Sequence, residues 1–250
     1  TYARLGTFKG LNNAGLRKMG GKIELYRGLP DFFDKLKHFV TGNPEYAQHE
    51  IRLEHYIVST GLRQMILGSK IAPYVDGVWA CEFIEDAPPP GYLDTRRKAV
   101  SEEPKIISQI AYALDNTTKT RAIFEINKGS NKIPDIAVNA MIPDEDRRVP
   151  FQNMIYIADG PSDIPVFSLI NQYGGRTFAV YQPGSSKEFN QVNSLQKQKR
   201  VQSFGEANYT EDSQTSMWLK NAITEICSQI VKNRERALGD KIGKPPQHLE

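Results

Sequence analysis

Apolar residues along this chain of 250 residues follow two spacings, one typical of helices and one typical of buried strands. Phe32, Leu36 and Val40 fall on one face of a helical repeat, which predicts an amphipathic helix over 31–40 that ends at Gly42. The same reasoning predicts further helices over 8–19, 62–67, 118–127, 164–173 and 213–236.

Short, continuous apolar runs predict strands that are buried on both faces. The clearest is 154–158, and further strands are predicted over 56–58, 78–83, 177–181 and, at a sheet edge, 201–204. Residues 86–104 and 129–150 read as irregular, and 185–200 stay ambiguous. Because helices alternate with strands, we predict the α/β class, with a three-layer Rossmann-like parallel sheet that has helices on both faces.

In such a sheet the ligand lies beyond the carboxyl ends of the strands. The run 154–163, "MIYIADGPSD", delivers Asp159 and Asp163 there. Two carboxylates four residues apart are suitable oxygen ligands for a hard cation such as Mg²⁺. Alternatively, Ser162 caps the next helix and Asp163 complements its dipole. That alternative does not explain Asp159, which ends a strand.

The segment "YIVSTG" places a hydroxyl, that of Ser59, at the end of another predicted strand. Thr60 and Gly61 would turn the chain into a helix, whose first backbone N–H groups could bind a phosphoryl oxygen beside Ser59. Ser-Thr-Gly is also ordinary turn chemistry, so this segment is weak support by itself.

Lys119 and Lys128 flank the predicted helix over 118–127. A crossover helix runs antiparallel to the strands, so its start lies near the carboxyl edge of the sheet and its end at the far edge. We therefore select Lys119 as the cation for a phosphate and interpret Lys128 as a solvated surface lysine. The alternative is that both lysines are solvated.

Composition excludes several classes of function. The net charge of +3 is too small to indicate nucleic-acid binding. Cys81 and Cys227 lack metal-ligand spacing and are interpreted as buried, reduced thiols. No apolar run approaches the ~18 residues that a membrane helix needs. We expect a cytoplasmic protein without a membrane partner.

Taken in order, these segments resemble the motifs of the haloacid dehalogenase superfamily. "YIVSTG" looks like motif two, "KTRAIFEINKG" like the lysine-bearing motif three, and "YIADGPSD" like the acidic motif four. "YRGLPDFFDKLK" is similar to the helix that precedes motif two in phosphoserine-phosphatase-like members. The resemblance covers roughly 23–181, and the acidic motif is its most specific part.

The resemblance implies a Mg²⁺-dependent phosphatase acting on a small phosphorylated metabolite. An aspartate in a DxDx[TV] motif would form an aspartyl-phosphate. Ser59, with Thr60 and Gly61, would bind a phosphoryl oxygen, and Lys119 would stabilise negative charge. Asp159 would ligate Mg²⁺, with Asp163 beside it as a ligand or a positioning group.

The chain departs from this pattern because no DxD occurs before Ser59. We therefore expect the nucleophile on a segment upstream of Thr1. Residues 1–22 would be the remnant of a helical cap, 23–238 the core domain and 239–250 a tail. The main alternative is a non-catalytic binding or regulatory domain. A true dehalogenase needs no Mg²⁺, so the paired acids argue against it, and a receiver domain is shorter.

Overall fold

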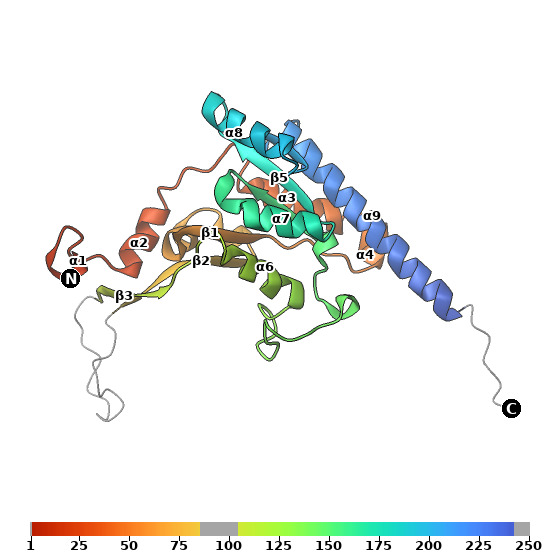
Figure 1. Cartoon of the computed structure of the whole chain (residues 1–250), viewed down its shortest axis with the longest axis horizontal. Helices are drawn as coiled ribbons and strands as arrows, with labels where there is room; N and C mark the ends of the chain where they lie inside the picture. The colour runs from red at the N-terminus through yellow and green to blue at the C-terminus, as the bar shows by residue number, and fades with distance from the viewer. Residues whose placement is uncertain (1, 86–104, 243–250) are drawn as a thin grey trace. The chain divides into compact units, whose positions relative to one another are not determined.

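The computed structural model describes residues 2–85 and 105–242 (Figure 1). They form two compact units, each built from two stretches of chain. The first unit draws on Thr1–Leu25 and His55–Ala122, and the second on Tyr26–Glu54 and Ile123–Glu250. Helix α6 (Lys119–Lys128) begins in the first unit and continues in the second.

The first unit contains a three-stranded mixed sheet in the order β1-β2-β3. Strand β1 (Tyr56–Leu62) is parallel to β2 (Gly77–Glu85), which is antiparallel to β3 (Ile107–Tyr112). The helical elements of this unit are α1 (Tyr2–Leu5), α2 (Asn13–Gly20), α5 (Arg63–Gly68), the 3-10 turn η1 (Ala72–Tyr74) and the start of α6.

Helices α2 and α5 approach at backbone distance because glycines lie at their contact. A Cβ on Gly20 would overlap the carbonyl group of Met65, and one on Gly68 would overlap the carbonyl group of Arg17. Helix α2 begins at Asn13 rather than at residue 8, since the Asn12 side chain accepts a hydrogen bond from the Gly15 N–H at 2.6 Å.

The second unit contains a three-stranded, wholly parallel sheet in the order β4-β5-β6. Its strands are β4 (Ile155–Ala158), β5 (Arg176–Tyr181) and β6 (Ser203–Glu206). Its other elements are α3 (Asp31–Thr41), α4 (Pro44–Gln48), α7 (Ile164–Gln172), α8 (Ser186–Lys197), α9 (Gln214–Ile242), the rest of α6, and the 3-10 turns η2 (Asp144–Asp146), η3 (Phe151–Asn153) and η4 (Pro161–Asp163).

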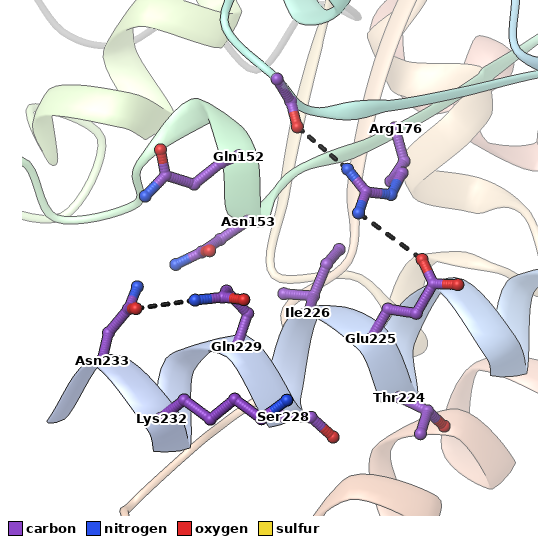
Figure 2. Close-up of a pocket in the computed structure, with 11 residues that line it drawn as sticks. Gln152, Asn153, Arg176, Thr224, Glu225, Ile226, Ser228, Gln229, Lys232 and Asn233 are labelled. Carbon is purple, nitrogen blue, oxygen red and sulfur yellow. Dashed lines mark hydrogen bonds and ion pairs between the residues drawn. The ribbon is translucent and has the colours of Figure 1, made fainter. Parts of the chain in front are cut away.

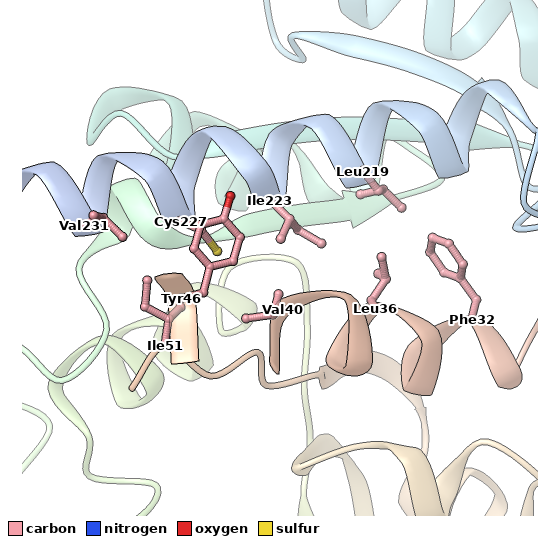
Figure 3. Close-up of a cluster of buried hydrophobic side chains, with 9 residues drawn as sticks. All are labelled: Phe32, Leu36, Val40, Tyr46, Ile51, Leu219, Ile223, Cys227 and Val231. Carbon is pink, nitrogen blue, oxygen red and sulfur yellow. The ribbon is translucent and has the colours of Figure 1, made fainter. Parts of the chain in front are cut away.

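Alternation along β4 directs its side chains to different cores on the two faces of this sheet. Ile155 and Ile157 pack against a cluster formed mainly by α3, α4 and α9, whose contacts Figure 3 shows. Tyr156 and Ala158 pack against the cluster formed by α7, α8 and β5. The buried members of the first cluster are Phe32, Leu36, Val40, Tyr46, Ile51, Leu219, Ile223, Cys227 and Val231.

The mixed α/β class is confirmed, as sheets with parallel strands are flanked by helices. The helix predicted over 31–40 is present as α3, and the strand predicted over 154–158 is present as β4. The edge strand predicted over 201–204 is β6, shifted by two residues. The predicted irregular segment 86–104 and residues 243–250 of the predicted tail lie outside the described residues. The division into cap remnant, core and tail stays a prediction.

Three elements differ from expectation. The strand predicted to stop at Val58 continues to Leu62 through a bulge, in which residues 59–61 lose register with β2. The ambiguous segment 185–200 contains helix α8, whose first turn is capped by the Ser185 hydroxyl. Strand β3 was not predicted, because its side chains are largely exposed and lack a clear apolar alternation.

None of the described helices is long and apolar enough to cross a membrane. Both cysteines are free thiols; Cys227 is buried and Cys81 only half-buried, so the prediction of two buried thiols is correct for Cys227 alone. Burial raises the pKa of Cys227 to about 11, which keeps this thiol protonated at neutral pH.

Replacement of Leu36 by Ala should destabilise the second unit by about 2–5 kcal/mol, because it empties part of the core between α3 and α9. The matched control is Leu238→Ala on α9, where the side chain is 55% exposed and the cost should stay within about 0.5 kcal/mol. Urea unfolding measures both, and labelling of Cys227 by a thiol reagent should accelerate only in the Leu36 variant. Equal stability of the two variants would contradict this description of the core.

Replacement of Gly20 by Ala should cost about 1–3 kcal/mol, since the added methyl group meets the α5 backbone, which has little room to shift. The adjacent Gly21→Ala is the control, because its Cβ would lie 3.4 Å from the Lys18 carbonyl oxygen, an ordinary contact. Amide hydrogen exchange of α2 and α5 should be faster in the first variant only. Similar exchange in both variants would argue against the close approach of these helices.

Candidate functional site

Strand β4 ends at Ala158 and presents Asp159 at the carboxyl edge of the parallel sheet. The Asp159 side chain is exposed, whereas the next residue, Gly160, is buried. The Gln191 side chain on α8 donates a hydrogen bond to the Asp159 backbone oxygen at 3.2 Å. A Cβ on Gly160 would lie 2.6 Å from the Gln191 amide nitrogen, so a larger residue would displace the end of this side chain. The Gln191 side chain thus contacts the backbone here, while the Asp159 carboxylate faces solvent.

Asp163 has the opposite environment, with only 3% of its surface exposed. The Tyr156 hydroxyl donates to its Oδ1 at 2.5 Å, and the Ser162 hydroxyl donates to its Oδ2 at 2.7 Å. Asp163 occupies the N-cap position of α7 but makes no side-chain capping hydrogen bond. The capping role considered for Ser162 is therefore wrong, because its hydroxyl binds the Asp163 carboxylate instead.

The negative charges of these acids contribute to raised pKa values of two tyrosines. Burial, followed by the negative charges of Asp163 and Asp159, raises the pKa of Tyr156. The pKa of Tyr26 is also raised, first by burial and then by Glu188 and Asp159. Both phenols remain protonated at neutral pH and can act as hydrogen-bond donors.

Tyr26 and Glu188 were not identified from the sequence. Glu188 lies in the first turn of α8, where its carboxylate accepts a hydrogen bond from the Gln182 N–H at 2.7 Å. A Ser at 185 followed by a Glu at 188 is a capping-box spacing, which could have located both α8 and Glu188. No comparable pattern marks Tyr26.

Asp159 and Asp163 supply the hard oxygen atoms that Mg²⁺ prefers, but they do not complete a site alone. Within residues 2–85 and 105–242, no group of three or more His, Cys, Asp or Glu side chains is arranged to hold a metal ion. The donor chemistry fits Mg²⁺, and further ligands would have to come from water, substrate or another segment.

Ser59, Thr60 and Gly61 lie in the first unit, at the bulge of β1. The Ser59 hydroxyl oxygen accepts a hydrogen bond from the Gly61 N–H at 3.0 Å, so this backbone donor is already engaged. Helix α5 begins only at Arg63 and spans six residues. The local structure is a serine turn, and backbone donors aimed at a phosphate are not evident around Ser59.

Lys119 is the first residue of α6 and is 4% exposed. The turn before it is held by Asp115, whose Oδ1 accepts hydrogen bonds from the Thr117 and Thr118 N–H groups at 2.8 and 2.7 Å. The hydrogen bonds from Thr118 lower the pKa of Asp115. This lysine lies at the helix start, as predicted, and in the first unit with Ser59.

Lys128, at the other end of α6, is not a solvated surface lysine. Its ammonium group donates to the backbone oxygens of Val138 and Ala140 at 2.6 and 2.7 Å. It therefore holds the loop that follows α6. Of the candidates, Ser59 and Lys119 belong to the first unit, and Asp159 and Asp163 to the second.

A polar hollow of about 660 Å³ lies at the amino ends of β4 and β5, the edge opposite to Asp159 (Figure 2). Arg176 lines this hollow. Its guanidinium group donates a hydrogen bond to the Gly174 backbone oxygen at 3.0 Å and forms an ion pair with the Glu225 carboxylate at 3.5 Å. On α9, Gln229 donates to Asn233 at 2.7 Å. Four of the side chains that line the hollow thus form two pairs, Arg176 with Glu225 and Gln229 with Asn233.

Comparison with known proteins gives one informative match. No family model matches the chain, and no solved structure matches it. It is 41% identical over 233 residues to an uncharacterized protein of Borreliella burgdorferi strain B31, in an alignment that covers 92% of this chain and 76% of that protein. The chain belongs to the family of this Borreliella protein.

Membership in this family indicates common ancestry. It assigns no activity to this chain, because the Borreliella protein is uncharacterized. The roles of Asp159 and Asp163 therefore depend on their chemistry and on the order of motifs along the chain. The alignment covers too much of this chain for the likeness to rest on a single motif.

Proposed function

We propose that this chain is the greater part of a Mg²⁺-dependent phosphohydrolase of the haloacid dehalogenase superfamily. The observation that carries the proposal is the contrast at the end of β4, where an exposed Asp159 stands next to a buried, hydrogen-bonded Asp163. A charged residue that ends an apolar strand and faces solvent at the carboxyl edge of a parallel sheet is well placed to bind a ligand.

The proposed mechanism assigns each residue a task. Asp159 and Asp163 would hold Mg²⁺, which neutralises phosphate charge when it is bound. The Ser59 hydroxyl, with Thr60 and Gly61, would bind a phosphoryl oxygen, and Lys119 would neutralise developing negative charge. The nucleophilic aspartate would come from an upstream segment.

The strand order supports an additional strand. Among the described strands, β4 pairs only with β5, although its sequence is apolar throughout and both of its faces contact core residues. Edge strands of stable proteins usually carry charges or prolines that block pairing. We propose that an upstream strand pairs with β4 and carries the nucleophile beside Asp159. The complete protein would then have the three-layer Rossmann-like sheet, with residues 1–22 belonging to a helical cap.

A non-catalytic binding or regulatory domain on the same scaffold is the alternative. The observation that favours it is the absence of a DxD sequence before Ser59. Such a domain could still bind Mg²⁺ or phosphate at Asp159 without turnover.

Replacement of Asp159 by Asn in the full-length protein should abolish Mg²⁺-dependent hydrolysis of an aryl phosphate, a loss of at least about 100-fold, because the amide keeps the size but removes the charge. Asp135→Asn is the control, since this aspartate is exposed in the loop after α6. Colorimetric release of the aryl alcohol measures both variants. Turnover by the Asp159 variant at the wild-type rate would exclude the phosphohydrolase proposal.

The complete gene product should contain a DxDx[TV] sequence at the end of an apolar strand upstream of Thr1. Its intact mass should therefore exceed the 28.2 kDa of this chain by several kilodaltons. Mass spectrometry of the purified natural protein checks this. A mass of 28.2 kDa would leave the nucleophile without a source and favour the non-catalytic alternative.

A further inference from the structure

The contact between Tyr156 and Asp163 joins the middle of β4 to the start of α7. The Tyr156 ring lies on the face of the sheet that α7 covers and meets the Phe167 ring edge to face, with centroids 5.5 Å apart. From there its hydroxyl reaches Oδ1 of Asp163 at 2.5 Å. Tyr156 thereby connects the packed core to one of the two acids at the sheet edge.

Asp163 is oriented by hydroxyl groups on both of its oxygens. Tyr156 donates to Oδ1, and Ser162 donates to Oδ2. The two donors fix the plane of the carboxylate, whereas the carboxylate of a solvated aspartate rotates freely.

The simplest alternative is that Tyr156 is a core residue whose hydroxyl takes the nearest acceptor. Two features argue that Tyr156 has a more specific role than that of a core residue. Asp163 is almost wholly buried, although an aspartate at a helix N-cap could bind the helix N–H groups from the surface. The serine next to it also gives its hydroxyl to the carboxylate, so both donors converge on one acid.

We propose that Tyr156 is a positioning residue that, together with Ser162, orients the Asp163 carboxylate for Mg²⁺ at the end of β4. This inference rests on the proposed function. Partners that orient a metal ligand commonly change metal affinity by 10–100-fold when they are removed, because a ligand left free to rotate must be ordered when the ion binds. Asp159, exposed at the strand end, would supply the first contact with the ion.

The test uses the full-length protein and direct calorimetric titration with Mg²⁺ in the absence of substrate. Tyr156→Phe keeps the ring and its contact with Phe167 but removes the hydroxyl, and Mg²⁺ should bind about 10–100-fold more weakly. With an aryl phosphate, the Mg²⁺ concentration for half-maximal rate should rise by the same factor. The rate at saturating Mg²⁺ and the substrate KM should change little.

Tyr46→Phe is the control, because Tyr46 is a buried tyrosine of the cluster formed by α3, α4 and α9. Its Mg²⁺ affinity should equal that of the wild type. A purely structural role of Tyr156 would lower thermal stability and leave Mg²⁺ affinity unchanged, and that result would overturn the inference. If Tyr156→Phe does not fold, Ser162→Ala serves instead, because it removes the other donor to Asp163 from a partly exposed position. This variant should also bind Mg²⁺ more weakly. Unchanged Mg²⁺ affinity would again overturn the inference.

Asp159→Asn separates this inference from the function on which it rests. If Asp159→Asn no longer binds Mg²⁺ while Tyr156→Phe binds it with wild-type affinity, the metal site is supported and the positioning role of Tyr156 is excluded. If the wild-type protein itself does not bind Mg²⁺, the proposed function fails first.

Discussion

The packing of β4 against apolar clusters on both of its faces is the constraint on which the second unit depends. Ile155 and Ile157 enter the core under α9, while Tyr156 and Ala158 enter the core under α7 and α8. A strand held in this way cannot slip by one residue, because a slip would exchange its two faces. The position of Asp159 at the end of the strand is therefore determined by the apolar packing of the four residues that precede it.

The same packing explains why two aspartates four residues apart have different environments. Asp159 follows the last paired residue of β4, so its side chain leaves the sheet and meets solvent. Asp163 lies at the start of α7, which packs onto β4 and turns the carboxylate back toward Tyr156. One acid is thus free to meet a ligand, and the other is held in place before a ligand arrives.

Sequence patterns predicted the parts of the fold that depend on local apolar spacing. Helix α3 and strand β4 were found because their apolar residues follow the helical and strand repeats without interruption. Helix α8 stayed ambiguous because it has few apolar residues and begins with a polar cap. Strand β3 was missed because its side chains are largely exposed and lack a clear apolar alternation. The serine turn at Ser59 follows from one hydrogen bond to the Gly61 N–H, which residue types alone do not specify.

The candidate site shows the same limit. Spacing placed Asp159 and Asp163 at one strand end, but it could not show that the second acid is buried, since that depends on how α7 packs. Tyr156 was counted only as an apolar strand residue, although its hydroxyl reaches an acid seven positions later. A tyrosine in a buried strand has to place its hydroxyl somewhere, and the end of the next loop is the nearest polar group. A tyrosine in a strand that leads into a loop with two acids therefore merits inspection as an orienting group for the second acid, as Tyr156 is for Asp163.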